Sequence, residues 1–189
     1  MTQFVDEKAA IVPASSVYIQ ARRKDMKNNI LILTALGLTS LFATNASAAS
    51  YVSSNAATKT ATLTVDASQG TAGGGLNFNG AVKGAKSFTV PAGWNVVLNF
   101  KNLGTLAHSA AVVKGSTPPL NVTAKDLAFP GAETKMVMQG LAMNAADSAK
   151  FKATTAGTYL IVCGVPGHAL GGQYLGLKVV AGAKAATYQ

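Results

Sequence analysis

Short segments rich in β-branched and aromatic residues dominate the chain after residue 58, and Gly, Pro or Asn bounds nearly every one of them. Turn signals that recur about every ten residues are typical of a β-sandwich or barrel. We therefore predict an all-β fold, with strands at 60–65, 75–79, 87–90, 95–100, 108–113, 134–138, 149–153, 157–162 and 173–180.

One stretch breaks this pattern. Residues 115–132 lack clean alternation of apolar and polar side chains and contain Pro118 and Pro119. Proline cannot donate to a strand ladder, so we expect an irregular excursion there, with room for a short helix. The folded domain should cover 60–182, after a small, polar linker at 49–59 and before a tail at 183–189.

The N-terminal residues have the organisation of an export signal. Met26 and Lys27 precede an apolar run at 30–41, and residues 45–48 read Asn-Ala-Ser-Ala. A positive start, a short apolar run and an Ala-x-Ala ending describe a secretory signal peptide, here 26–48 with cleavage after Ala48. The run is short for a transmembrane helix, and retention as a membrane anchor is the alternative.

Residues 1–25 precede this signal and mix acids with bases. They indicate a start codon placed too early, with Met26 as the true first residue, or an extended n-region. A twin-arginine signal at Arg22-Arg23 is a weaker rival, because Lys24 and Asp25 follow where such signals turn apolar. Either signal predicts a periplasmic or otherwise extracytoplasmic protein.

The exported part, 49–189, contains 11 lysines, no arginine and four acidic residues, a net charge of +7. Nucleic-acid surfaces favour arginine forks and stacking aromatic side chains, so this composition argues against a nucleic-acid partner. A basic balance instead fits an acidic partner protein or peripheral contact with an anionic membrane surface.

Cys163 is the only cysteine of the chain, and His108 and His168 are its only histidines. A single cysteine cannot form an internal disulfide, and a free thiol is a liability outside the cytoplasm, so a metal-ligand role is favoured. The Gly-Val-Pro-Gly turn after Cys163 reverses the chain, so that His168 can face the same point as the thiol. Such a pre-organised loop has little entropy left to lose when a metal binds.

One thiolate and two imidazoles, with a weak fourth ligand, are the donor set of a type 1 (blue) copper site. A second turn at Gly171-Gly172 delivers Gln173 as the candidate fourth ligand. Zinc is an alternative metal, although structural zinc sites usually recruit more cysteine. The remaining alternative is a buried free cysteine with two incidental surface histidines.

The loop from Cys163 through His168 to position 173, with an upstream histidine after Asn-Phe-Lys-Asn at 99–102, resembles that of the cupredoxins. Blocks at 75–80, 90–100 and 159–168 are similar to those of the sulfocyanins among them, and the resemblance covers about 60–182. It implies a Greek-key β-sandwich of the cupredoxin type, one type 1 copper ion and one-electron transfer outside the cytoplasm. The implied ligands are His108, Cys163 and His168, with position 173 axial.

Two residues depart from that family's pattern. Sulfocyanins and most cupredoxins have an axial methionine, whereas Gln173 resembles the axial glutamine of stellacyanin. An oxygen donor is harder than a thioether and favours the cupric state, which predicts a lower reduction potential. Ser109 stands where many cupredoxins have asparagine, and its hydroxyl can still link the two ligand segments over a shorter reach.

We expect a monomeric carrier of single electrons, not an enzyme, that meets a cytochrome, an oxidase or another electron carrier. The loop around His168 is rimmed by Val165, Pro166, Ala169 and Leu170. Such an apolar patch suits the small interfaces through which redox partners meet.

Three other functions remain as alternatives. They are a copper-trafficking or storage module without redox cycling, a red copper enzyme with Glu133 as an added ligand, and a metal-free β-sandwich interaction module. Met136 and Met138 alternate, and we expect them in the core rather than in a Cu(I) relay. Met143 is the alternative to Gln173 as the axial ligand.

Overall fold

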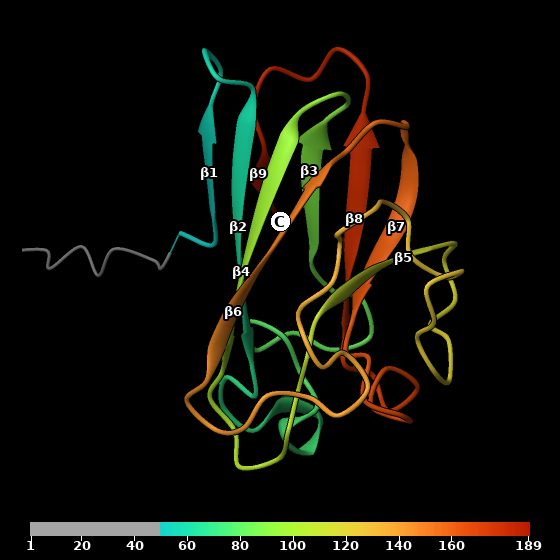
Figure 1. The fold of residues 1–189 in the computed structure, drawn as a ribbon. Helices are drawn as coiled ribbons and strands as arrows, with labels where there is room; N and C mark the ends of the chain where they lie inside the picture. Colours follow the sequence, from blue (N-terminus) through green and yellow to red (C-terminus); the bar gives the residue numbers. More distant parts are fainter. Residues whose placement is uncertain (1–49) are drawn as a thin grey trace, which may run out of the picture. The chain divides into compact units, whose positions relative to one another are not determined.

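The computed structural model describes residues 50–189, which fold as two β-sheets packed face to face (Figure 1). The first sheet has the order β1-β2-β4-β6 and consists of β1 (Val52–Asn55), β2 (Thr60–Ala67), β4 (Asn95–Asn102) and β6 (Ala146–Lys152). The second has the order β5-β7-β8-β3-β9 and consists of β5 (Ala111–Lys114), β7 (Gly157–Val162), β8 (Tyr174–Val180), β3 (Ser87–Pro91) and β9 (Thr187–Tyr188). The predicted all-β sandwich is confirmed.

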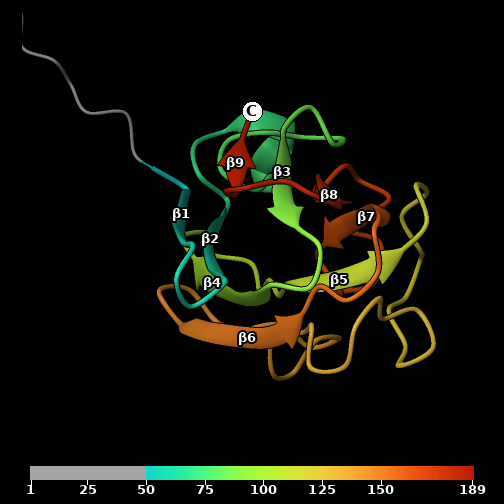
Figure 2. The same ribbon diagram turned by 90° about the horizontal axis from the view of Figure 1, so that it is seen from above.

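The chain crosses between the sheets, as a Greek key requires. β3 follows β2 but belongs to the other sheet, so β2 pairs in parallel with β4, and β3 pairs in parallel with β8. The other strand pairs are antiparallel. Seen from above, the strands surround a space that the core side chains fill (Figure 2).

Alternation along the strands creates this core. In β2, Ala61, Leu63, Val65 and Ala67 are fully buried while the residues between them are partly exposed, because successive side chains of a strand point to opposite faces. β4 repeats the pattern, and its Phe100 meets Phe78 edge-on with ring centroids 6.4 Å apart. The packing of the two sheets fixes the ends of the strands. It thereby fixes the starting points of the loops at one end of the sandwich.

Most predicted strands are present, with shifted ends, and two are wrong. Residues 75–79 begin in a 3₁₀ turn at Ala72–Gly75, where three consecutive glycines have positive φ. Only two isolated bridges, from Phe78 to Ala67 and to Ala81, remain of the predicted strand. Residues 134–138 form a turn in which Met136 has a φ of 53°, so the alternation there does not describe a strand. The segment predicted at 108–113 becomes β5 only from Ala111.

The excursion at 115–132 is irregular, as predicted, and contains no helix. The short edge strands β1 and β9 lie inside 49–59 and 183–189, which the sequence indicates as linker and tail. Residues 1–25 and the predicted signal peptide at 26–48 lie outside the described residues. Within 50–189, no helix has the length and apolar character needed to cross a membrane.

Candidate metal centre

His108, Cys163 and His168 converge on one point, and their donor atoms all lie within 4.8 Å of one another. The loop between β7 and β8, which carries two of them, lies at the lower end of the sandwich in Figure 1. The Sγ atom of Cys163 is 3.9 Å from Nδ1 of His108 and 3.6 Å from Nδ1 of His168, and the two Nδ1 atoms are 3.2 Å apart. Metal bonds of about 2.0–2.1 Å to nitrogen and about 2.3 Å to sulfur, directed at a shared trigonal centre, separate the donors by about 3.5–3.8 Å. The observed triangle therefore fits a single metal ion.

The loop between β7 and β8 supplies two of these donors. Cys163 follows the last residue of β7, and its N–H donates to the carbonyl of Gln173 across the base of the loop at 3.1 Å. Within the loop, the N–H of Gln173 donates to the carbonyl of His168 at 3.1 Å, and that of Gly171 donates to the carbonyl of Gly167 at 2.9 Å. Gly171 packs closely on Leu76, whose Cδ1 would lie 2.7 Å from a Cβ there. The loop is therefore tightly closed before any metal binds.

The third donor comes from the segment between β4 and β5. His108 exchanges two backbone hydrogen bonds with Leu141, at 3.2 Å and 2.7 Å. Asn102, buried at the end of β4, donates from Nδ2 to the carbonyls of Leu106 and Leu141, and its Oδ1 accepts from the N–H of Gly104. These bonds set the position of His108 opposite the Cys163 loop.

The hydroxyl of Ser68 determines which imidazole nitrogen of His108 carries the proton. Ser68 Oγ donates to the carbonyl of Gly75 at 2.6 Å and lies 2.8 Å from Nε2 of His108. Because the hydroxyl proton is used on Gly75, Ser68 accepts from Nε2–H. The lone pair of His108 is then on Nδ1 and points at Cys163, as a metal ligand requires.

Gln173 lies beside the three donors with its side chain fully buried. Its Nε2 donates to the carbonyl of Asn77 at 3.1 Å, which fixes the orientation of the amide. Its Oε1 is buried and has no hydrogen-bond partner. A buried, unpartnered acceptor is costly unless something fills its lone pairs, so this oxygen fits a fourth, weak metal ligand.

Burial controls the protonation of the site. It lowers the pKa of His108 to about 4, with a further lowering from the neighbouring His168, whereas the nearby side-chain amide of Gln173 acts to raise it. Burial also lowers the pKa of His168, again opposed by Gln173. The pKa of the Cys163 thiol is raised by burial, although hydrogen bonds from Ser109 and Val165 oppose this. The imidazoles are therefore neutral and able to bind a metal near neutral pH, whereas the thiol needs a cation to ionise it.

Ser109 links the two ligand segments, as its position after His108 predicts. Its hydroxyl donates to the carbonyl of Val137 at 2.6 Å and accepts from the N–H of Gly164 at 2.9 Å. Its own N–H points at the Sγ of Cys163, 3.5 Å away. One small side chain thus joins three loops around the thiol.

The three methionines of the described range are all exposed, which corrects the prediction for two of them. Met136 and Met138 are 56% and 41% exposed, not core residues, because 134–138 is a turn and has no inward strand face. Met143 is 51% exposed on a turn before β6 and does not cap the buried centre. Glu133 forms an isolated backbone β-bridge with Ala111. It is not grouped with His108, Cys163 and His168.

Sequence reasoning missed Ser68, Asn102 and Asn77, whose contacts orient His108 and Gln173. The Asn-Phe-Lys-Asn strand end at 99–102 is a sequence signal for Asn102. Ser68 has no such signal, because its partner is 40 residues away along the chain.

Comparison with known proteins agrees with this geometry. The family model described as the sulfocyanin (SoxE) domain matches residues 46–189. The sulfocyanin of Sulfolobus acidocaldarius is 31% identical over 130 residues, which are 66% of this chain and 64% of that protein, so the chain spans less than two thirds of the length of this relative.

Two solved structures are similar to this chain. The reduced auracyanin of Roseiflexus castenholzii is 25% identical, covers 63% of this chain and 96% of its own, and has a TM-score of 0.48. Reduced rusticyanin is 24% identical, covers 65% of this chain and 85% of its own, and has a TM-score of 0.44.

Proposed function

Because this chain belongs to the sulfocyanin family of cupredoxins, which bind one type 1 copper ion, we propose that it is an exported carrier of single electrons between redox partner proteins. The observation that carries the proposal is the donor triangle of His108, Cys163 and His168. The buried, unpartnered Oε1 of Gln173 beside that triangle supports it.

The residues have separate roles in this proposal. Nδ1 of His108, Nδ1 of His168 and Sγ of Cys163 would hold the ion as the strong ligands, and Oε1 of Gln173 would be the weak fourth ligand. Bound copper supplies a Cu(I)/Cu(II) couple that takes up or gives away one electron. Ser68, Ser109 and Asn102 keep the ligands in place through the hydrogen bonds described above. A rigid ligand set needs little rearrangement between the two oxidation states.

Partner contact is proposed at the loop that carries His168. His108, Cys163 and Gln173 are buried, whereas His168 is only half-buried. Leu170, two residues on, is 55% exposed, and Pro166 is also exposed. A small apolar patch beside a ligand edge allows short-lived contact with a redox partner. The net charge of +7 on 49–189 favours acidic partners.

We propose that the protein is exported, because residues 26–48 have the sequence of a signal peptide. We also propose that it is an electron carrier and not an enzyme; in residues 50–189 the grouped donors are His108, Cys163 and His168, with no further carboxylate or imidazole. Intact mass of protein from the exported fraction tests the first point. A chain that begins near Ala49 supports cleavage, and a mass that includes residues 30–41, found only in detergent extracts, contradicts it.

Voltammetry of the copper-loaded protein separates the electron carrier from a copper-trafficking module. A carrier gives a reversible one-electron wave, and it retains copper through repeated cycles because the same ligands serve both oxidation states. A trafficking module loses copper to a Cu(I) chelator after one reduction. Loss of the ion on reduction, at equal protein stability, would overturn the proposal.

A further inference from the structure

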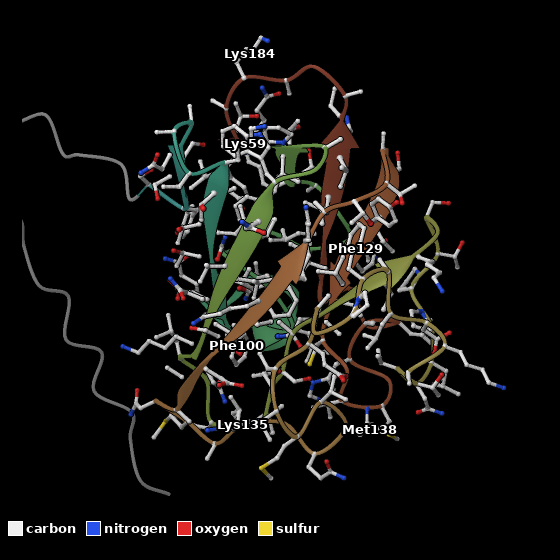
Figure 3. The ribbon with its side chains drawn as sticks, turned by 45° about the horizontal axis from the view of Figure 1, so that its top comes forward. Lys59, Phe100, Phe129, Lys135, Met138 and Lys184 are labelled. Carbon is white, nitrogen blue, oxygen red and sulfur yellow. The ribbon has the colours of Figure 1, made fainter. Side chains whose placement is uncertain are left out.

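Every methionine in residues 50–189 is exposed: Met136 at 56%, Met138 at 41% and Met143 at 51%. Methionine is one of the residue types most often found buried. Two of the three lie on one turn, with a single residue between them. Met138 lies at the end of the sandwich opposite Lys59 and Lys184 (Figure 3).

This turn is anchored to the metal centre by the residue between the two methionines. Val137 is half-buried, and its carbonyl accepts the hydrogen bond from the Ser109 hydroxyl. A Cβ added to Gly164, the residue after Cys163, would collide with the Val137 side chain. Val137 thus packs onto the ligand loop, whereas the methionines on either side of it are exposed.

The backbone of the turn is closed tightly. The N–H of Gly140 donates to the carbonyl of Met136 at 2.7 Å, and Met136 has a positive φ of 53°. A non-glycine residue in this region is strained and indicates a constraint on the backbone. Gly140 itself packs on the backbone of His108, whose N would lie 2.8 Å from a Cβ there. The turn therefore contacts both ligand segments of the metal centre.

Thioethers are soft, neutral ligands that select Cu(I) over harder ions. They have no proton to lose, so a cation does not compete with protons for them. The methionine side chain is unbranched and has three rotatable bonds, so each thioether can reorient towards an ion through side-chain rotation.

We propose that Met136 and Met138 form a transient Cu(I) capture site that takes a cuprous ion from solution or from a donor protein and passes it to the buried ligands. This proposal depends on the proposed function in one respect only, namely that the ion is passed to the buried ligands His108, Cys163 and His168. The ion changes neither charge nor oxidation state during the transfer, and the Cys163 thiol releases its proton as it binds.

The first test isolates the capture site from the buried one. In the full chain with Cys163→Ala, the methionine methyl groups are labelled with ¹³C, and Ag(I), then Cu(I) under anaerobic conditions, is added. We expect the methyl signals of Met136 and Met138 to shift together at one equivalent, while that of Met143 stays in place. Unmoved signals for Met136 and Met138, or an equal shift of Met143, would overturn the proposal.

The second test measures loading of the buried centre in the wild-type background. Met136→Leu/Met138→Leu keeps the apolar surface but removes both sulfur atoms, and Met143→Leu is the matched control. We expect the double variant to take up Cu(I) several-fold more slowly, with an unchanged final reduction potential, and the control to load at the wild-type rate. Equal loading rates in all three proteins would show that the two methionines serve only as apolar surface.

The two proposals fail in different ways. If the methyl signals shift but no copper chromophore forms in the wild-type protein, the capture site stands and the electron-carrier function falls. If the buried centre takes up Cu(I) at the same rate with and without Met136 and Met138, and the chromophore appears once the loaded protein is oxidised, the electron carrier stands and the capture site falls.

Discussion

The hydroxyl oxygen of Ser68 lies 2.8 Å from Nε2 of His108 and donates its own proton to the carbonyl of Gly75. Ser68 has a positive φ of 57°, a conformation that costs a serine free energy. A Cβ on Gly104 would collide with Ser68, so the glycine makes room for this contact. The backbone is thus bent to place one acceptor behind a metal ligand.

Replacing Ser68 should weaken the metal centre without destroying it. In Ser68→Ala the buried Nε2–H of His108 loses its acceptor, so we expect copper affinity to fall by about 10–100-fold. Competition with a chelator measures this, and ¹⁵N NMR of the metal-free variant should show His108 as a mixture of tautomers. The exposed Ser53→Ala on β1 is the control. An unchanged affinity and a single tautomer in Ser68→Ala would contradict the role of Ser68.

The identity of the axial ligand sets the reduction potential. If Oε1 of Gln173 is that ligand, Gln173→Met replaces a hard donor with a soft one and favours Cu(I). We expect the potential to rise by about 60 mV or more, the value for a tenfold change in relative affinity in a one-electron couple, with the visible colour kept. Gln173→Ala should also raise it, provided that no water enters.

Voltammetry of these variants and of the exposed Gln189→Met, as a control, measures the effect. Potentials that stay within a few millivolts of the wild-type value in both Gln173 variants would mean that Gln173 is not a ligand.

Removing the Ser109 hydroxyl should loosen the loops around the thiol. In Ser109→Ala the carbonyl of Val137 and the N–H of Gly164 lose their partner inside the protein, at a cost of about 1–3 kcal/mol for each group. We expect the free energy of unfolding to fall by about 2–6 kcal/mol in urea titrations, with the visible band retained because the Ser109 N–H still faces Cys163. The exposed Ser148→Ala is the control. Equal stability of the two variants would contradict this account.

The metal-free protein should lose stability as the pH falls from about 6.5 to about 4. The folded pKa of His108 is lowered to about 4 by burial, whereas an unfolded histidine titrates near 6.5. Between these values the unfolded chain binds more protons, so the free energy of unfolding decreases as the pH is lowered. The full contribution of His108 is present above pH 6.5.

Urea unfolding at pH 7, 5.5 and 4 measures this slope. His108→Gln is the comparison, because it removes the titrating group and leaves the carboxylates of the chain unchanged. The same pH dependence in the wild-type protein and in His108→Gln would show that His108 does not cause it.

The candidate metal ligands could be proposed from the sequence because the chain offers few other candidates. With one cysteine and two histidines, only one combination of thiol and imidazole ligands is possible. Cys163, His168 and Gln173 belong to one short loop, and its Pro and Gly residues indicate the turns. The local sequence was therefore sufficient to predict that these three side chains lie close together. The structure brings this loop to His108, as the sequence predicts.

Other features depend on contacts or backbone conformations that the sequence does not reveal. Ser68 meets His108 across a separation of 40 residues, and no residue pattern indicates such a pair. At 134–138 the apolar alternation suggests a strand, but the positive φ of Met136 makes a turn and exposes the two methionines. Backbone conformation overrides periodicity in that segment.

The visible spectrum of the Cys163→Ser variant tests the central claim most directly. Both proteins receive one equivalent of cupric ion, and absorption is recorded together with the midpoint of thermal unfolding. In the wild-type protein we predict an intense visible band from the Cys163 thiolate and a raised midpoint, because copper binds the folded state. In Cys163→Ser we predict no intense band and little copper-dependent stabilisation, and a strongly blue Cys163→Ser protein would contradict the account.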